Sequence, residues 1–387
     1  MVYKCKNCGS AVVYDAGRKK LVCEYCNSEF TAGEIENSYL KDGDPSDMME
    51  SNVYVCSACG ATLMTNDVEA ATFCAYCGQP AIVFDRVSKV KKPDYIIPFK
   101  ITKDVAYARI KEKMAQGKFI PSKIKKITPD VVRGIYIPFS MSDVHYEDRE
   151  ILRSKASGKG DSKCYYYRQG VANFKNLPVD CSVKFNDESA KRLEPFPDES
   201  LKEFNAAYLS GFYADMGDEK NADLHDKIYR AAGDAFHKSV EKTIKADYIE
   251  ILQCAPKCEI LETKYVLAPV WFFACNTENF RCTIMVNGYT GKVIGAVPVD
   301  KKRVAALFTS IFIPLLVVFV LVFGGLGALI VEADIDLDGD IIEVIVAGIS
   351  AVFFGALAKF KALKKSIGLS SEADIFELAK NREEGQK

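Results

Sequence analysis

The strongest hydrophobic pattern in the chain is a pair of apolar segments near its C-terminal end. Residues 304–331 form a run of 28 residues without a charged side chain, more than the roughly 20 that a helix needs to cross a bilayer. A second, weaker segment covers residues 344–358 and is extended by two isoleucines beyond Glu343. Small residues recur every four positions in both segments, a spacing that lets helices pack closely in lipid. This pattern predicts a transmembrane helical hairpin over residues 303–361.

Basic residues flank the hairpin on its two outer sides. They are Lys301, Lys302 and Arg303 before it and Lys359, Lys361, Lys364 and Lys365 after it, with no Lys or Arg between. The positive-inside rule therefore predicts two spans in the cell membrane, with both termini and the tail 362–387 in the cytoplasm. The acidic loop 334–340 matches the first half of a calcium loop. Position 12 of that motif falls on Ile345, so no calcium site is predicted.

Shorter patterns of strands and helices fill residues 86–302. Apolar runs that are typical of strands cover 131–139, 163–170, 265–275, 280–286 and 293–297, and Asn287-Gly288 predicts a hairpin turn before the last of these. Helical patterns cover 102–116, 198–208 and 219–245. The first of these is expected to be capped by Thr102, with Val105, Ile110 and Met114 on its inner face. Together these patterns predict an α+β middle domain.

Composition changes the picture most at the N-terminus, which holds eight of the 14 cysteines as four CxxC pairs. The pairs are Cys5/Cys8, Cys23/Cys26, Cys56/Cys59 and Cys74/Cys77. Each cysteine of the first set recurs 51 residues later, and each set has 14 residues between its two pairs. No export signal precedes the first pair, so the thiols are expected to stay reduced in the cytosol. The repeat therefore predicts a duplicated unit.

Two CxxC pairs supply four thiolates, which complete a tetrahedral zinc site. We expect two small zinc ribbons, at residues 1–30 and 52–85, each holding one Zn²⁺ ion. The acidic linker 31–51 between them is expected to contain a short helix. Redox-active CxxC pairs would require a thioredoxin-like βαβ context, which the pattern does not contain. Four-sulfur iron is the remaining alternative.

Charge argues against nucleic acid as the partner of the ribbons. Residues 1–85 contain six Lys/Arg and 12 Asp/Glu, a net charge of −6, whereas binding to phosphates requires clustered positive charge. The next segment, 86–126, has 13 Lys/Arg against three acidic residues, a net charge of +10. It forms either a solvated basic face or a contact with anionic lipid or an acidic partner.

The middle domain carries little that predicts catalysis. Its three histidines, His145, His225 and His237, have no neighbouring nucleophile motif, and no phosphate-binding glycine loop is present. The expectation is that the protein is not an enzyme. Cys254, Cys258, Cys275 and Cys282 are candidates for a third metal site, but buried strand thiols that act as small hydrophobic side chains are the preferred interpretation.

The order of ribbons, middle domain and anchor resembles the membrane-anchored TFIIB-type zinc-ribbon proteins of Gram-positive bacteria. The matching motifs are the CxxCG pairs and residues 95–100 (YIIPFK), 134–139 (GIYIPF), 208–212 (YLSGF), 265–271 (YVLAPVW) and 287–292 (NGYTGK). The chain departs from the family pattern at Ser140, where a tryptophan is expected. The resemblance implies SPFH-type or phage-shock-type partners and a role in membrane stress.

Two functions follow as hypotheses. The first is a non-enzymatic adaptor that recruits cytosolic proteins to the membrane through its ribbons and basic segment. The alternative is a membrane-tethered regulator that binds nucleic acid or takes part in transcription. That alternative would need a basic ribbon surface, which the charge of residues 1–85 does not provide.

Overall fold

The computed structural model describes residues 3–36, 48–58, 60–64, 74, 76, 82–115, 132–155, 163–182, 187–215, 217, 221–246, 248–277 and 280–295, with isolated positions between 302 and 313. Within this part, no helix is both long enough and apolar enough to cross a membrane. The transmembrane hairpin predicted over residues 303–361, its acidic loop and the tail 362–387 lie outside the described residues, apart from those isolated positions.

The first cysteine unit is built on a small antiparallel sheet. Its strands are β1 (Val12–Asp15), β2 (Lys20–Cys23) and β3 (Glu29–Phe30), in the order β1-β2-β3. A short helix, α1 (Ala32–Glu36), follows and is capped by Thr31, whose hydroxyl accepts from the amide of Glu34 at 3.3 Å. Glu34 in turn accepts from the Thr31 amide, a reciprocal pair that fixes the start of the helix. The short helix expected in the linker is therefore present.

The other described strands all belong to one twelve-stranded sheet. Its main path runs β10 (Lys202–Glu203), β7 (Tyr95–Ile96), β13 (Lys257–Thr277), β8 (Val132–Lys155), β11 (Tyr213–Asp215), β5 (Thr62–Met64), β4 (Met48–Cys56) and β6 (Ile82–Lys91). Off this path, β12 (Ile249–Gln253) and β9 (Lys163–Asp180) pair with β8, while β14 (Phe280–Asn287) pairs with β13 and β15 (Val293–Gly295). The middle domain is thus mostly β, with fewer helical residues than an α+β domain suggests.

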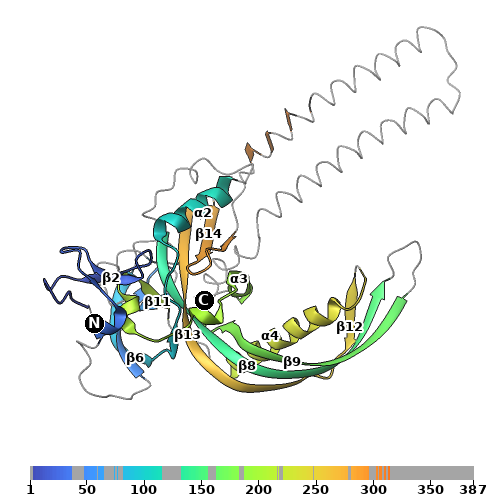
Figure 1. Cartoon of the computed structure of the whole chain (residues 1–387). Helices are drawn as coiled ribbons and strands as arrows, with labels where there is room; N and C mark the ends of the chain where they lie inside the picture. Colours follow the sequence, from blue (N-terminus) through green and yellow to red (C-terminus); the bar gives the residue numbers. More distant parts are fainter. Residues whose placement is uncertain are drawn as a thin grey trace, which may run out of the picture.

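Three long strands, β8, β9 and β13, curve together, and helix α4 (Asn221–Glu241) lies along the concave side of the curve (Figure 1). Apolar side chains of the helix, among them Ile228 and Phe236, pack with Val144 and Tyr146 of β8 in one core cluster. Alternate residues of β9 point away from the helix, so Tyr165 and Tyr167 are exposed. The predicted helix at 219–245 is confirmed by α4.

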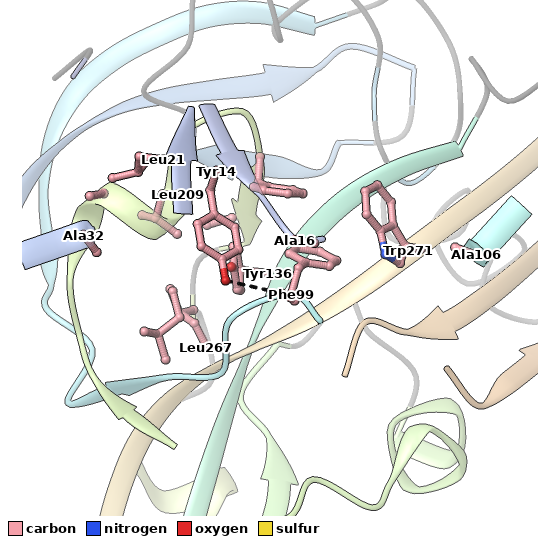
Figure 2. Close-up of a cluster of buried hydrophobic side chains, with 14 of the residues drawn as sticks. Tyr14, Ala16, Leu21, Ala32, Phe99, Ala106, Tyr136, Leu209, Leu267 and Trp271 are labelled. Carbon is pink, nitrogen blue, oxygen red and sulfur yellow. Dashed lines mark hydrogen bonds between the residues drawn. The ribbon is translucent and has the colours of Figure 1, made fainter. Parts of the chain in front are cut away.

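A second cluster joins the small sheet to the large one (Figure 2). At its centre Phe99 stacks on Phe212, with ring centroids 4.3 Å apart and planes 13° apart. The rings of Tyr136 of β8 and Trp271 of β13 also contact that of Phe99, with centroids 5.1 and 4.8 Å from its own. Tyr14 reaches the cluster from strand β1, and its hydroxyl donates to the carbonyl of Phe99 at 3.4 Å.

Helix α2 (Lys103–Ala115) confirms the pattern predicted for 102–116, including its cap. The amide of Val105 donates to the Thr102 hydroxyl at 3.4 Å. Ile110 and Met114 are buried as expected, but Val105 is exposed and Ala106 takes the inner position. The prediction for Val105 was wrong. Ala106, Ile110 and Met114 are spaced four residues apart and so lie on one face of the helix, whereas Val105 lies outside this spacing.

The helix predicted over 198–208 is wrong. The segment forms two short 3₁₀ turns, η4 (Asp198–Ser200) and η5 (Ala206–Leu209), separated by strand β10. Lys202 pairs with Ile96 in the sheet, so the backbone there is extended. The Asn205 side chain then accepts from the amide of Ala207 at 2.9 Å and starts a separate turn. Sheet pairing overrides the helical pattern.

The turn predicted between β14 and β15 is confirmed. The Asn287 side chain accepts from the amides of Tyr289 and Thr290, both at 2.9 Å, and Gly291 adopts a positive φ of 76°. The same side chain donates to the carbonyl of Leu193 at 2.8 Å, which ties the turn to the last residue of α3 (Asp187–Leu193). The turn is therefore fixed by buried polar contacts as well as by its own residues.

We predict that Phe99→Ala lowers the free energy of unfolding of the full-length chain by about 3–5 kcal/mol, because it empties a fully buried aromatic position. Trp271 is the only tryptophan in the sequence and lies in this cluster, so its fluorescence during denaturant unfolding measures the effect. Phe84→Ala removes an exposed ring on β6 and is the matched control, with an expected loss below about 1 kcal/mol. Equal losses in both variants would contradict the central role of the cluster.

Candidate metal centre

The first CxxC pair forms a tight turn at the start of the chain. The amide of Cys5 donates to the carbonyl of Ser10 at 2.7 Å, and the amide of Gly9 donates to the carbonyl of Cys5 at 2.9 Å. Gly9 has a φ of +79°, which a residue with a side chain rarely adopts. The turn also aims the amide of Asn7 at the sulfur of Cys5, 3.4 Å away. This geometry explains why glycine follows the second cysteine.

The second pair repeats the turn with a different residue at the left-handed position. The amide of Cys23 donates to the carbonyl of Ser28 at 2.9 Å, and the amide of Asn27 donates to the carbonyl of Cys23 at 2.8 Å. Asn27 has a φ of +57°, a conformation that asparagine tolerates better than most residues. The Asn7 side chain donates to the Ser28 hydroxyl at 2.8 Å and links the two turns.

Together the two turns bring the sulfur atoms of Cys5, Cys8, Cys23 and Cys26 within 4.8 Å of one another. The sulfur of Cys5 lies 3.5 Å from that of Cys26, and the sulfur of Cys8 lies 3.4 Å from that of Cys23. Four thiolates around a zinc ion, at about 2.3 Å each, have sulfur–sulfur separations of roughly 3.8 Å. The cluster therefore fits one tetrahedral zinc ion without rearrangement of the chain.

Hydrogen bonds favour the thiolate form on the exposed side of the cluster. The Ser28 hydroxyl, 3.1 Å away, and the Ser28 amide lower the pKa of Cys26 to about 6. The Ser10 amide lowers the pKa of Cys8 in the same way. The backbone hydrogen bond from Cys26 lowers the pKa of Cys23, but burial and the neighbouring thiols outweigh this effect and raise the pKa to about 11. A bound cation would offset that cost, since metal binding requires deprotonated thiols.

Sequence reasoning missed the two serines, although a signal for them is present. Each follows its pair at the same distance, in Cys8-Gly9-Ser10 and Cys26-Asn27-Ser28. The carbonyl of each serine accepts a hydrogen bond from the amide of the first cysteine of the pair. The amide or hydroxyl of each serine lowers the pKa of the second cysteine. A small polar residue two positions after the second cysteine is therefore part of this site.

The metal-binding unit is attached to the large sheet through strand β1. The amide of Tyr14 donates to the carbonyl of Ser210 at 3.1 Å, and its ring meets that of Tyr208 edge-on with centroids 5.1 Å apart. Cys5 and Cys23 are buried on this side, whereas Cys8 and Cys26 face solvent. The cluster thus lies between a packed interface and an open surface.

The second cysteine set repeats the first turn. The amide of Cys56 donates to the carbonyl of Ala61 at 2.9 Å, and the amide of Gly60, with a φ of +67°, donates to the carbonyl of Cys56 at 2.7 Å. Cys56 and Cys74 are both fully buried and belong to one core cluster. Cys59 and Cys77 lie outside the described residues. The structure thus contains a site that fits the first predicted zinc ion, whereas the second zinc site remains a prediction.

The surroundings of the two sets differ. The first set is carried by its own small sheet, whereas Cys56 ends β4, a strand of the twelve-stranded sheet. Strand β6, paired with β4, runs across residue 85, where the second ribbon was expected to end. Strand β5 pairs with β11 of the middle domain, so the second unit continues directly into the large sheet.

The cysteines proposed for a third metal site are only partly described. Cys254 is exposed, so the expectation of a buried strand thiol is wrong for this residue, and Cys258 is half-buried. The backbones of Cys275 and Cys282 pair between β13 and β14, and their side chains are not among those described. Among the described residues, Cys5, Cys8, Cys23 and Cys26 are the group whose side chains lie close enough together to hold a metal ion.

These features define a class: proteins with a four-cysteine metal-binding unit packed on a mostly β domain. The chain is 30% identical over 349 residues to the uncharacterized protein YdjG of Bacillus subtilis (strain 168), an alignment that covers 84% of this chain and 98% of that protein. The chain therefore belongs to the same family as YdjG. No family model matches the chain, and no solved structure matches it.

We predict that metal-replete protein contains about two zinc ions per chain, measured by elemental analysis. Replacing Cys8 and Cys26 together by serine should lower the ratio to about one, because it removes two of the four ligands of the first site. Cys164→Ser changes an exposed cysteine outside the pairs and should leave the ratio unchanged. A ratio near one in the unmodified chain, or stoichiometric iron, would contradict a second zinc site.

Proposed function

We propose that the chain is a non-enzymatic, membrane-anchored zinc-ribbon adaptor that recruits cytosolic proteins to the membrane. The apolar segments 304–331 and 344–358 support the anchor. The resemblance to membrane-anchored zinc-ribbon proteins supports a role in membrane stress with SPFH-type or phage-shock-type partners.

The geometry of the first cysteine cluster supports a structural metal. All four ligand positions are filled by protein thiolates, so no coordination position is open for water or a substrate. A metal in such a site stabilises the small unit, whose own apolar core is too limited to fold it alone. The unit is then a rigid platform for contacts with other proteins.

The observation that carries the proposal is the free edge of the large sheet at β6. Among the described elements, β6 pairs with β4 only and ends the main path of the sheet. Val83, Phe84 and Val87 on this strand are 60%, 51% and 59% exposed. An edge strand with exposed apolar side chains is a template on which an extended segment of another protein can add a strand.

Charge specifies the chemistry of that partner. Lys89, Lys91 and Lys92 follow the apolar residues on β6 and are exposed, at the start of the basic stretch 86–126. An acidic segment with alternating apolar residues would therefore match both features of the edge. This surface lies beside the second cysteine unit, whose buried Cys56 ends the neighbouring strand β4.

We expect Phe84→Asp with Val87→Asp to weaken binding of a purified phage-shock-type protein to the full-length chain by at least about tenfold, or 1.4 kcal/mol. The two aspartates place charge where the partner strand would pack. Val105→Asp, at an exposed apolar position on α2, is the matched control and should bind normally. The dissociation constants can be measured in detergent by fluorescence anisotropy.

Three other outcomes have a defined meaning for this proposal. Unchanged affinity in the double variant would move the docking surface away from β6. If the unmodified chain binds neither a phage-shock-type nor an SPFH-type protein, the adaptor role is overturned. Salt-resistant, sequence-selective binding of DNA would favour the nucleic-acid regulator instead.

The membrane arrangement has its own test. A single cysteine probe at Asp338 should be labelled from outside intact cells, while probes at either terminus stay protected, because all seven flanking Lys/Arg lie on the terminal sides of the hairpin. Labelling of the C-terminal tail in intact cells would refute two spans. The adaptor surface on β6 could then still be tested on its own.

A further inference from the structure

A cavity of about 160 Å³ lies between the end of β9, helix α3 and helix α4. It has space for roughly five water molecules, taking about 30 Å³ for each. Ala190 of α3 and Ala231 of α4 line it, and their short side chains leave the space open. The remaining lining is mostly charged, which is unusual for a packing defect between two helices and a strand.

A buried ion pair forms one wall of the cavity. Lys227 of α4 donates to the Asp180 carboxylate at 3.3 Å, and the two side chains are only 15% and 3% exposed. Removing two charges from water costs several kcal/mol per ion, and a well-packed apolar pair would stabilise a fold equally well. At the rim, Lys191 and Asp234 form a second pair at 2.8 Å.

The two remaining charged groups of the cavity, Arg230 and Glu194, have no such partner. Arg230 donates through Nε to the carbonyl of Asp226 in its own helix at 3.3 Å, and no carboxylate among the described residues pairs with it. The backbone carbonyl of Glu194 accepts from Lys292 at 2.6 Å, but its carboxyl group makes no hydrogen bond within the described structure. The cavity thus offers one guanidinium fork and one carboxyl group.

We propose that this cavity binds a small organic carboxylate. The guanidinium of Arg230 holds the carboxylate group of the ligand, and the Glu194 side chain forms a hydrogen bond with that carboxylate or with a second polar group of the ligand. Arginine binds carboxylates through two parallel hydrogen bonds, which selects the planar group. The other four charges of the cavity balance as Lys227 with Asp180 and Lys191 with Asp234. This site is independent of the adaptor surface on β6.

The charge of Glu194 makes binding depend on pH. Burial raises the pKa of Glu194 to about 7, against the opposing effect of Lys191 on α3, Lys292 after the β14–β15 turn and Lys238 on α4. Lys227, Arg230 and Asp234 of α4 and Asp180 of β9 also face the cavity. Below this pKa the neutral acid can donate to a bound carboxylate, whereas above it the ionised group repels the ligand.

The test uses glycolate as the probe and full-length protein in detergent, with binding followed by saturation-transfer NMR. We expect saturable binding that Arg230→Gln weakens by at least about tenfold. Lys242→Gln removes an exposed cation just after α4 and should bind like the unmodified chain. As the pH rises from one unit below to one unit above the pKa of Glu194, the affinity for glycolate should fall by about tenfold, and Glu194→Gln should remove this pH dependence.

Several results would overturn the proposal. They are the absence of saturable glycolate binding, equal affinity in Arg230→Gln, and tighter binding of inorganic phosphate or of ethylammonium than of glycolate. Trp271 fluorescence checks that each variant is folded. Arg230 is exposed and is not part of the aromatic cluster around Trp271, so its substitution should leave the fluorescence of a folded chain unchanged. Because β6 takes no part in this site, the Phe84 and Val87 variants should bind glycolate normally.

Discussion

The stacking of Phe99 on Phe212 is the contact on which the described architecture depends. Phe99 lies in the segment after β7, Phe212 follows η5, and the rings of Tyr136 and Trp271 close the cluster from β8 and β13. A Cβ atom at Gly134 would lie 2.5 Å from Phe212, and one at Gly288 would lie 2.6 Å from Phe99. Both positions therefore require glycine, and the motifs that contain them are explained by the space that the two rings occupy.

The same cluster links the metal site to the rest of the chain. Strand β1 starts four residues after Cys8 and carries Tyr14, whose hydroxyl donates to the carbonyl of Phe99. The Tyr136 hydroxyl is buried beside this contact with no hydrogen-bond partner among the described residues, a state that costs roughly 1–3 kcal/mol. A four-thiolate zinc site can supply on the order of 10 kcal/mol of folding free energy, so a zinc ion held by the first cysteine set would stabilise β1 and, through Tyr14, its packing on the aromatic cluster.

Local motifs were predictable from the sequence, and long-range pairing was not. The first two cysteine pairs, the turn at Asn287 and the helix α4 depend on residues close together in the chain, and the structure contains all three. The full length of β8 was missed because the strand carries Asp148 and Glu150, which are charged but buried. Asp148 accepts from the amide of Ala255, and Glu150 lies 3.1 Å from His237, so partners distant in sequence stabilise them. No periodicity in one segment can reveal such partners.

The two cysteine sets show how one repeated motif acquires two structural roles. Both begin with the same turn, at Cys5 and at Cys56, and the described cysteines at matching positions, Cys5 with Cys56 and Cys23 with Cys74, are all buried. The first set, however, is carried by its own three-stranded sheet, whereas Cys56 ends a strand of the twelve-stranded sheet. Near Cys74, the Tyr76 hydroxyl donates to the buried carboxylate of Asp215, which also accepts from Ser182 at 2.9 Å. Loss of Cys56 would therefore disturb the large sheet itself, and with it the edge at β6. For this reason, substitutions of exposed residues on β6 separate docking from folding, whereas substitutions of the second set of cysteines cannot.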